Sequence, residues 1–348
     1  MEKILIVRLS SIGDIVQASA VPRLLKTRFP GAEIHWLVRA DNQELVEHNP
    51  FLTKIIAFDR SQSLSGWLRL CRHLNTENYT HLYDAHNNLR SFILRRLVRV
   101  KLTLVRSKNR FKRFLLFYLK LNLFGLNLRG VDSYINPLRA WGVANDFQGS
   151  QLFLPPTTYE KVRQLIPPGQ TWLAVAPATA WAKKTWPENY WKNLIGLILN
   201  ETSYGVVILG GPKDNFCKNF IMDSQRVISL QGKLSLLESA AATSFCKTLI
   251  AGDTGLLHMA ESLQKDVVGI LGPTPFGHPV REKSIGLQSK LWCQPCSKDG
   301  SGPCLNRTYQ NCMVQIQPPS VLNAVRELLG RSQMKDAPPS TNSFQGQL

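Results

Sequence analysis

The chain has 348 residues, of which 44% are hydrophobic and 19% are charged. This length allows two domains of ordinary size, and this composition excludes a largely disordered protein. The formal net charge of +18 favours acidic partners, namely nucleic acid, anionic lipid or phosphorylated glycan, and does not specify a fold.

The first half of the chain alternates short apolar runs with helical patterns. A buried strand is predicted at residues 4–7, followed by a helix over residues 13–28 that Phe29-Pro30-Gly31 ends. Further strands are predicted at residues 33–38, 54–58, 81–84 and 101–105. Strands that alternate with helices predict a mostly parallel sheet with both faces covered.

The N-terminus shows no export signal. Met1-Glu2-Lys3 leads directly into the first apolar run, which is short and soon followed by polar residues. We therefore expect the protein in the cytosol. The cysteines number seven, which is odd, and so predict no disulfide framework.

A strongly basic region follows the fourth predicted strand. Residues 90–139 contain thirteen Lys and Arg residues and one acid, Asp132. The region surrounds an apolar stretch, residues 111–126, which is too short to span a bilayer and is interrupted by Lys120. A solvated basic face, a core helix and a segment lying in a membrane interface all agree with this pattern.

The alternation weakens over residues 145–170, where Pro155-Pro156 and Pro167-Pro168-Gly169 indicate a linker. It resumes with strands predicted at residues 172–176, 205–209, 226–230, 248–251 and 267–271. We therefore predict three parts: an N-terminal domain (1–155), a C-terminal domain (170–330) and a disordered tail (331–348). Two doubly wound α/β domains place a ligand cleft between the carboxyl ends of their sheets.

The first candidate motif is the segment RLSSIGD, which follows the first strand and ends at Asp14. Ser10 or Ser11 can cap the next helix. Gly13 permits a tight turn there, and Asp14 complements the helix dipole. Alternatively, Asp14 projects into the cleft and takes a proton from a hydroxyl group, while the serines and backbone N–H groups bind acceptor or phosphate oxygens.

The second candidate motif is the loop ATAWAKKTWP at residues 178–187, which follows a strand and precedes a helix. It carries Thr179 and Lys184. A lysine in such a loop can act as a point charge for a diphosphate, and a solvated loop is the alternative.

The third candidate motif is GDTGLLHMA at residues 252–260. The turn opens a helix whose N–H groups and dipole form an anion site, and a plain helix cap by Asp253 or Thr254 is the alternative. Gly255 belongs to the same turn. His258 lies four residues after Thr254, so both can face one side of the helix start.

Other motifs narrow the chemistry. No G-x-G-x-x-G follows the first strand and no P-loop occurs, so support for dinucleotide-dependent oxidoreduction and P-loop hydrolysis is weak. The absence of a recognisable nucleic-acid module argues against a nucleic-acid-binding protein. The spacing of Cys293, Cys296, Cys304 and Cys312 is compatible with a structural zinc, and a reduced cluster without metal is the alternative.

In this order, the three motifs resemble those of the ADP-heptose:lipopolysaccharide heptosyltransferases of glycosyltransferase family 9, over nearly the whole chain. The resemblance implies a GT-B fold of two Rossmann-like domains, with the acceptor on the N-terminal side. It also implies inverting transfer from ADP-L-glycero-D-manno-heptose to the lipopolysaccharide inner core, with no cofactor or metal required. Asp14 matches the catalytic base. The positions that match the donor and phosphate loops are Thr179, Lys184, Asp253, Thr254, Gly255 and His258. Ser10, Ser11 and Gly13 of the first motif complete the set of candidate binding residues.

The resemblance also implies partners. The acceptor is acidic and lipid-linked, so we expect contact with the cytoplasmic leaflet of the inner membrane of a Gram-negative bacterium, and the basic region as its docking surface. Replacing Arg95, Arg96 and Arg99 is then expected to weaken acceptor binding.

The sequence departs from the family at two loops. The loop Ala180-Trp181-Ala182 lacks a second threonine and the charged residues common there. Gly210 to Asp214 (GGPKD) stands where some members carry an acidic residue for the nucleotide ribose, and Lys213 or Asp214 can occupy that place. A GT-B transferase or epimerase for a different nucleotide sugar is therefore the alternative.

Overall fold

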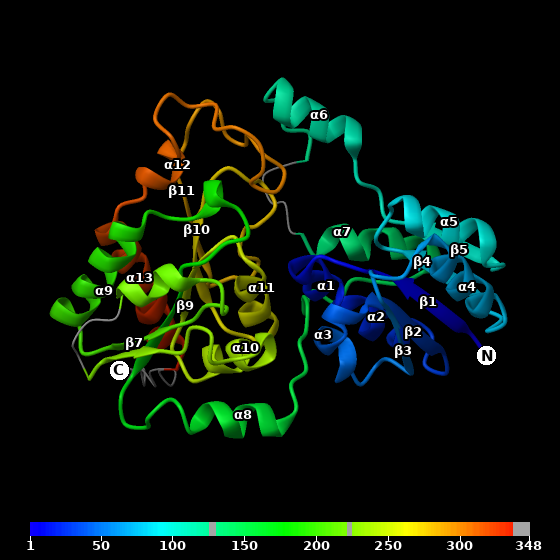
Figure 1. The fold of residues 1–348 in the computed structure, drawn as a ribbon, viewed down its shortest axis with the longest axis horizontal. Helices are drawn as coiled ribbons and strands as arrows, with labels where there is room; N and C mark the ends of the chain where they lie inside the picture. Colours follow the sequence, from blue (N-terminus) through cyan, green and yellow to red (C-terminus); the bar gives the residue numbers. More distant parts are fainter. Residues whose placement is uncertain (125–129, 221–224, 337–348) are drawn as a thin grey trace, which may run out of the picture.

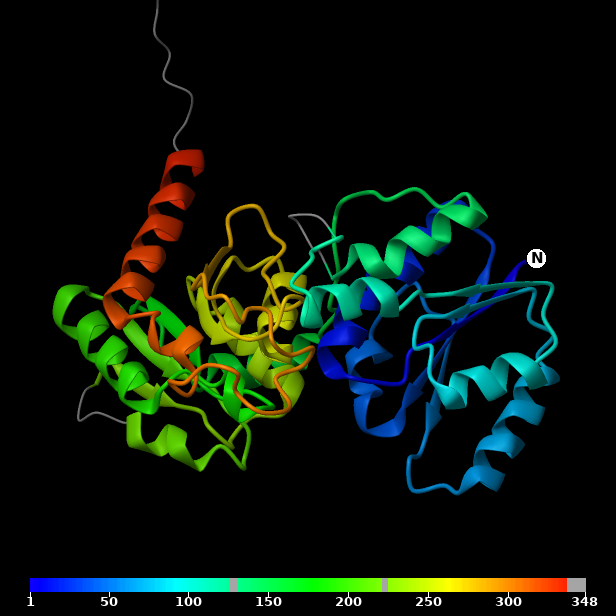
Figure 2. The same ribbon diagram turned by 90° about the horizontal axis from the view of Figure 1, so that it is seen from above.

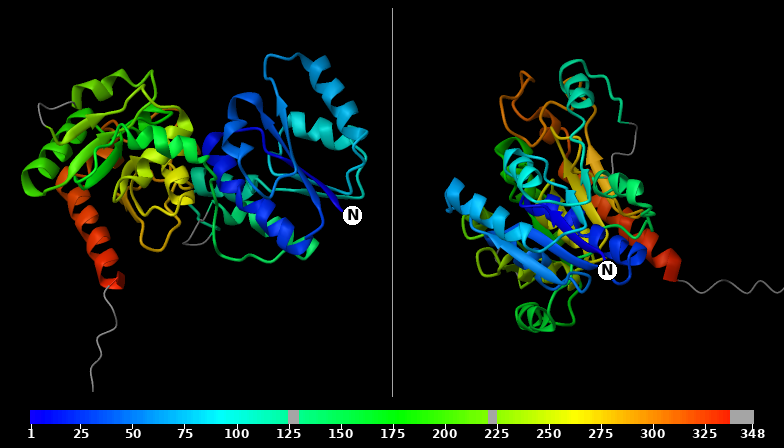
Figure 3. Two further views of the ribbon diagram at one scale, coloured as in Figure 1. Left: turned by 90° about the horizontal axis from the view of Figure 1, so that it is seen from below. Right: turned by 90° about the vertical axis from the view of Figure 1, so that its right-hand side faces the viewer.

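The computed structural model describes residues 1–124, 130–220 and 225–336. They form two parallel sheets, one in each half of the chain, and each sheet is surrounded by helices (Figure 1). The two halves lie side by side when the molecule is viewed from above and from below (Figures 2 and 3).

The first sheet has the strand order β3-β2-β1-β4-β5, and all of its pairings are parallel. Its strands are β1 (Lys3–Val7), β2 (Glu33–Arg39), β3 (Lys54–Phe58), β4 (His81–Asp84) and β5 (Leu102–Val105). The strand order reverses at β1, which is where ligands of doubly wound sheets bind. Since Asp14 follows β1, the topology places it at this reversal.

The helices of the first half connect these strands. They are α1 (Ile12–Ala18), α2 (Ala20–Arg28), α3 (Glu44–Glu47), α4 (Leu64–Asn75), α5 (Leu89–Leu97), α6 (Arg110–Tyr118) and α7 (Asp132–Ile135). The single helix predicted over residues 13–28 is two helices. Ser19 ends α1: its hydroxyl donates to the Val16 carbonyl at 2.6 Å and accepts from the Gln151 amide at 3.0 Å.

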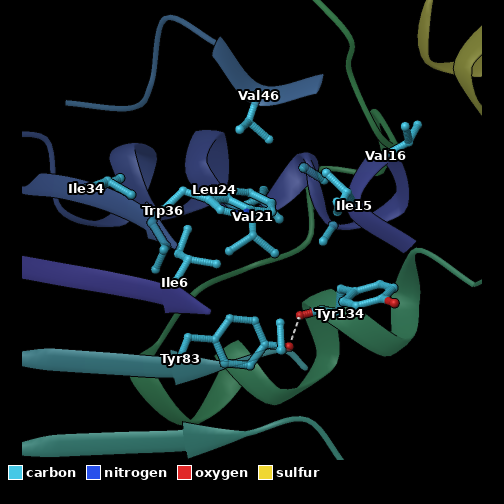
Figure 4. Packing of buried hydrophobic residues seen from close by; sticks show 14 of the residues in the cluster. Ile6, Ile15, Val16, Val21, Leu24, Ile34, Trp36, Val46, Tyr83 and Tyr134 are labelled. Atoms are coloured by element: carbon cyan, nitrogen blue, oxygen red, sulfur yellow. Dashed lines mark hydrogen bonds between the residues drawn. The ribbon is translucent and has the colours of Figure 1, made fainter. Parts of the chain in front are cut away.

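Strand β1 shows why the first sheet needs helices on both faces. Its residues from Ile4 to Val7 are fully buried. Ile4 and Ile6 belong to one core cluster and Leu5 and Val7 to another, because successive side chains of a strand point to opposite faces. Figure 4 shows the first of these clusters, in which the Tyr83 hydroxyl donates to the Tyr134 carbonyl at 2.7 Å.

The second sheet has the order β11-β10-β9-β6-β7-β8, again with parallel pairings. Its strands are β6 (Trp172–Ala176), β7 (Gly205–Ile208), β8 (Val227–Ser229), β9 (Leu249–Gly252), β10 (Val267–Leu271) and β11 (Ile285–Gln288). The order reverses between β6 and β9. The two predicted diphosphate loops follow these two strands, so the topology brings them together. Strand β11 was not predicted, because its half-exposed edge position lacks a continuous apolar run.

The helices of the second half are α9 (Glu188–Glu201), α10 (Leu236–Ser244), α11 (Gly255–Ser262), α12 (Asn311–Val314) and α13 (Pro318–Asp336). Helix α8 (Pro156–Arg163) lies within the predicted linker and packs against α10. Residues 331–336 of the predicted tail are helical, since α13 continues through them (Figure 3). The rest of that tail, residues 337–348, lies outside the described residues.

The two halves meet most closely where α1 packs against α11. A Cβ atom added at Gly255 would lie 2.7 Å from Cγ2 of Ile12, and one added at Gly13 would lie 3.1 Å from Cδ2 of His258. The first distance is shorter than real Cβ atoms show, and the second is tighter than most real Cβ contacts, so the two glycines permit the close approach of the helices. The starts of α1 and α11, which carry two of the predicted motifs, therefore meet at the seam between the halves.

Candidate active site

Asp14 lies in the first turn of α1 and its carboxylate has three side-chain partners. One oxygen, Oδ1, accepts from the Tyr134 hydroxyl at 2.5 Å. The other, Oδ2, accepts from the Ser11 hydroxyl at 2.9 Å and lies 2.5 Å from Nη2 of Arg8. The side chain nevertheless remains 37% exposed. Asp14 therefore supports the helix start, as a capping residue would, and still presents its carboxylate to an incoming group.

The partners of Asp14 determine its protonation state. Burial alone would raise the pKa of this carboxyl, but Arg8, Tyr134 and Arg106 outweigh burial and hold the pKa well below its usual range. The group is therefore ionised at neutral pH and is a weak base in the absence of a ligand.

Cationic side chains surround this carboxylate. Arg8 is almost fully buried, and it also donates to the Ala85 carbonyl at 2.8 Å. Arg106 stacks on the Tyr134 ring at 3.9 Å and donates to the Ser133 hydroxyl at 2.7 Å. Together with Arg113 and Lys108, they give the surroundings of Asp14 a surplus of positive charge that suits an anionic ligand.

The pKa values of the neighbouring groups reflect the same surplus. Burial lowers the pKa of Lys108, and the nearby Lys298 and Arg8 lower it further. Burial also lowers the pKa of Arg113, and Arg106 adds to this while Asp14 opposes it. His86, which is hydrogen-bonded to the backbone of Ser10, has its pKa lowered to about 4 by burial and then by Arg8 and Lys108. His86 is therefore neutral at neutral pH.

Lys184 and Asp253 form an ion pair on the other side of the seam. The Lys184 ammonium lies 3.0 Å from Oδ2 of Asp253, and the Thr274 hydroxyl donates to the same oxygen at 2.7 Å. Burial alone would raise the pKa of Asp253, but Lys184 first and the Thr274 hydrogen bond also lower it below its usual value. An ammonium has three N–H donors, so Lys184 can hold Asp253 and a phosphate oxygen at once.

The remaining predicted residues of the second half have mainly structural contacts. The Thr179 hydroxyl donates to the Trp181 carbonyl at 2.9 Å and lies 2.8 Å from the Thr185 hydroxyl. Thr254 caps α11, accepting from the Leu257 amide at 3.4 Å. His258 is buried, and its Nε2 lies 3.2 Å from the Gln17 amide nitrogen of α1. His258 and Gly255 thus lie at the seam between the halves.

The loop Gly210 to Asp214 is held by a hydrogen bond within the loop and by one to Gln231. The Asp214 carboxylate accepts from the Gly211 amide at 2.7 Å, and the Gly211 carbonyl accepts from the Gln231 side chain at 2.8 Å. Lys213 is exposed. Of the two residues proposed for the nucleotide ribose, Asp214 is engaged in its own turn and Lys213 extends to solvent.

The cysteine cluster does not assemble as a metal centre. All seven cysteines are free thiols, and Cys293 and Cys312 are buried. Burial, together with the nearby Cys296 and Cys293, raises the pKa of Cys312 to about 11. Within residues 1–124, 130–220 and 225–336, no group of three or more His, Cys, Asp or Glu side chains is placed to hold a metal ion. The zinc reading therefore finds no support, and the four cysteines pack as thiols.

A cavity of about 1320 Å³ lies beside this site and not at it. Its lining includes Leu116, residues 147–150 and His278, but not Asp14, Lys184 or Asp253. The volume of this cavity alone would make it the expected ligand site. The cavity has charged lining groups of its own, among them Glu261, Glu282 and Lys290, but the ion pairs of Asp14 and Lys184 lie outside it. His278, whose pKa burial lowers and Asp253 raises, connects the cavity with the ion pair.

Several of these residues were not predicted. Arg8, Ala85 and Arg106 directly follow β1, β4 and β5, and side chains at the carboxyl ends of parallel strands gather at one edge of a sheet. That rule could have identified Arg8 and Arg106. No sequence signal indicates Tyr134, because α7 reaches Asp14 only through the tertiary fold.

The sequence pattern described as glycosyltransferase family 9 (heptosyltransferase) matches residues 67–303. Lipopolysaccharide heptosyltransferase 1 of Pseudomonas aeruginosa is 25% identical, with 94% of this chain and 98% of that protein covered. Lipopolysaccharide heptosyltransferase 2 of Salmonella typhimurium is 23% identical, with 94% and 98% covered.

Solved structures show the same architecture. A family 9 glycosyltransferase of Veillonella parvula aligns with a TM-score of 0.78 at 21% identity, covering 95% of this chain and 98% of that one. The ADP-heptose lipopolysaccharide heptosyltransferase II of E. coli aligns with a TM-score of 0.74 at 20% identity, covering 95% and 99%.

Proposed function

The chain belongs to glycosyltransferase family 9, the heptosyltransferases, and has their GT-B fold, and from that membership we propose that it transfers heptose from ADP-L-glycero-D-manno-heptose to the lipopolysaccharide inner core. Relatives named lipopolysaccharide heptosyltransferases, which align over nearly the whole chain, support this substrate pair. The observation that carries the proposal is the pairing of an ionised carboxylate, Asp14, with a diphosphate-type site at Lys184 across one seam.

The donor binds at the switch point of the second sheet. Lys184 neutralises charge that develops on the departing ADP as the bond from its oxygen to the anomeric carbon breaks. Asp253 orients the ammonium, and the N-terminus of α11, capped by Thr254, faces the diphosphate. Thr179 fixes the loop that carries Lys184 through its contacts with Trp181 and Thr185.

The acceptor binds at the switch point of the first sheet. Its hydroxyl oxygen attacks the anomeric carbon from the face opposite the ADP, which inverts the configuration, and the hydroxyl proton passes to Asp14. A weak base suffices, because the hydroxyl becomes strongly acidic only as the new bond forms. Asp14 must be ionised for this step, and Arg8 and Tyr134 keep it so.

Anionic groups of the inner-core acceptor contact the cationic side chains around Asp14. Arg8, Arg106, Lys108 and Arg113 come from three segments of the first half, namely the end of β1, the loop after β5 and helix α6, and Asp14 balances one of their charges. The expected role of Arg95 needs correction. Its Nε lies 3.1 Å from a carboxylate oxygen of Asp84, which is fully buried, so Arg95 stabilises the fold and does not test acceptor binding.

The enzyme acts at the cytoplasmic face of the inner membrane, where its lipid-linked acceptor is exposed. No helix in the described part of the chain is long and apolar enough to cross a bilayer. We propose peripheral contact with the membrane, which the cationic excess of the basic region favours.

Substituting Asp14→Asn tests the base. The amide keeps the shape and can still accept from Tyr134, but it cannot take a proton. We expect kcat to fall about a thousandfold with the donor Kd changed less than about twofold. Mass spectrometry of the acceptor glycolipid after incubation with ADP-heptose measures the product.

Asp41→Asn is the matched control, since Asp41 is an exposed carboxylate of the same domain that pairs with Arg39. It should leave turnover unchanged. Near-normal turnover by Asp14→Asn would remove Asp14 from the reaction, and turnover of a UDP-sugar, or turnover without any acceptor, would favour the alternative transferase or epimerase.

A further inference from the structure

Helix α6 (Arg110–Tyr118) presents an aromatic face to solvent. Phe111 is 71% exposed, Phe114 51% and Tyr118 74%, whereas Leu116 is the buried residue of this helix. A helix that stabilises itself by packing would turn its large apolar side chains inward. The outward orientation of these three rings therefore indicates that a partner covers them.

The three rings form one continuous surface. Positions 111, 114 and 118 are three and four residues apart and so share one side of a helix. The Phe114 and Tyr118 rings lie 5.0 Å apart between centroids. We call Phe111, Phe114 and Tyr118 the aromatic ridge. The exposed Leu119, Leu121 and Leu123 follow it in the chain.

The opposite face of α6 is anchored to the second half of the molecule. Arg113 stacks on the Phe276 ring at 4.6 Å. Just beyond the helix, the Lys120 ammonium donates to the carbonyls of Cys293 and Pro295 at 3.0 and 2.9 Å. These contacts determine which face of α6 points outward, and they place it beside Trp292, which is 71% exposed. Figure 1 shows α6 projecting at the same end of the molecule as the loop that carries Trp292.

The surroundings of the ridge are cationic. Residues 85–131 contain no Asp or Glu. Exposed cations, Arg110 and Lys112, lie on α6 itself, and the half-buried Lys108 lies just before the helix. A protein partner would have to bury these charges and pair them with acidic side chains. An anionic bilayer attracts the same charges while they stay hydrated, and its interfacial region accommodates aromatic rings.

We propose that the aromatic ridge docks the protein on an anionic lipid bilayer, with α6 lying in the plane of the interface. The inner face of the same helix carries Arg113, which interacts electrostatically with Asp14. Docking therefore holds the mouth of the Asp14 site at the bilayer surface, where the sugars of a glycolipid emerge. This consequence for catalysis rests on the proposed function. The docking specifies the peripheral membrane contact proposed there and does not depend on the transfer reaction.

Vesicle flotation with the full-length protein tests the docking. We expect binding to vesicles of phosphatidylethanolamine and phosphatidylglycerol, and little binding to pure phosphatidylcholine. The triple substitution Phe111→Ser, Phe114→Ser and Tyr118→Ser should weaken binding by on the order of a hundredfold. The double substitution Leu64→Ser and Leu165→Ser removes exposed apolar side chains outside α6 and should bind as the wild type does.

A second variant keeps the rings and removes charge. Arg110→Gln with Lys112→Gln should weaken binding to the anionic vesicles by about tenfold. A cooperative thermal unfolding transition, measured for each variant, is the control for folding. The proposal is overturned if the wild-type protein does not bind anionic vesicles, or if both α6 variants bind as it does. The proposal is also overturned if the protein self-associates through the aromatic ridge and does not bind vesicles.

Activity separates this proposal from the proposed function. With an acceptor fragment that carries no lipid chains, the triple variant should keep its kcat and KM, whereas with acceptor embedded in vesicles its apparent KM should rise about tenfold or more. Vesicle binding by a wild-type protein that does not use ADP-heptose would support the docking and contradict the proposed function.

Discussion

At the scale of single residues, the surroundings of Asp14 satisfy two requirements that usually conflict. The carboxylate must stay ionised, which Arg8 and Tyr134 ensure, and it must remain accessible, which its 37% exposure allows. Lys184 and Asp253 show the same combination on the donor side. In the proposed mechanism, one side chain on each side carries the charge that reacts and its partners hold it in place.

Lys108 provides a residue-scale prediction for acceptor binding. Burial and the neighbouring cations destabilise its ammonium, as its lowered pKa shows, so an anionic acceptor would relieve this repulsion. We expect Lys108→Gln to raise the acceptor KM about three- to tenfold and to leave the donor Kd unchanged, as measured by initial rates and by titration calorimetry.

Lys101→Gln is the control for this prediction. Lys101 is exposed and precedes β5, so it lies at the opposite edge of the sheet from Lys108. It should have no effect on the kinetics with an acceptor lacking lipid chains. Equal weakening of acceptor and donor binding by Lys108→Gln would contradict its assignment to the acceptor.

At the scale of elements, the contact of α1 with α11 sets the position of both reactive loops. Each helix begins at the carboxyl end of a strand, one at the switch point of each sheet. The contact depends on two glycines and on the pair Gln17–His258. Because Asp14 and Thr254 lie in or beside the first turns of these helices, a shift of the seam would move both.

The substitution Gly255→Ala tests this seam. The new Cβ would lie 2.7 Å from Cγ2 of Ile12, so one helix must move. We expect a loss of about 1–2 kcal/mol in the free energy of unfolding, measured by urea denaturation, together with reduced kcat.

An Ile12→Ala background supplies the internal check. It removes the methyl group that clashes, so Gly255→Ala made there should be neutral or stabilising, since alanine favours a helix more than glycine does. Gly31→Ala, at a position with no atom near the added Cβ, should change stability by less than about 0.5 kcal/mol. Additive effects of the two seam substitutions would contradict the proposed contact.

At the scale of the whole molecule, the net charge is strongly positive, and several carboxylates are paired with Lys or Arg side chains. Among them are Asp14, Asp253 and Glu77. Lys3 and Lys54 lower the pKa of Glu77 to about 2, by hydrogen bonds of 2.5 and 2.6 Å that connect β1 and β3 to the loop before β4. Glu44 and Glu261 act in the opposite direction, because burial raises their pKa values.

These shifts predict acid lability. A carboxyl whose pKa is lowered by folding contributes stability that is fully present above its unfolded pKa and is lost as pH falls through its folded pKa. We therefore expect the free energy of unfolding to decline from about pH 5 to about pH 2. In Glu77→Gln, this decline should be shallower and the stability at pH 7 lower by about 1 kcal/mol. Urea denaturation across this range measures both, and a flat profile for the wild type would refute the expectation.

The sequence by itself determined the alternating strands and helices, and with them the two doubly wound sheets. Apolar runs of four or five residues, such as Ile4 to Val7, are a local signal, because a strand covered on both faces needs apolar side chains at every position. The three motifs and their order were also sufficient to indicate the family. Their place at strand ends follows from the topology of parallel sheets.

Only the tertiary structure decided which of these residues act together. The sequence gives no sign that Tyr134 hydrogen-bonds to Asp14, that Arg95 holds a buried Asp84, or that His258 faces Gln17 across the seam. It also left three readings open for the apolar part of the basic region, and the exposed rings of α6 exclude a core helix. The physical reason is that a residue's sequence neighbours determine its local conformation, whereas its pKa, its burial and its ligand depend on segments far away in the chain.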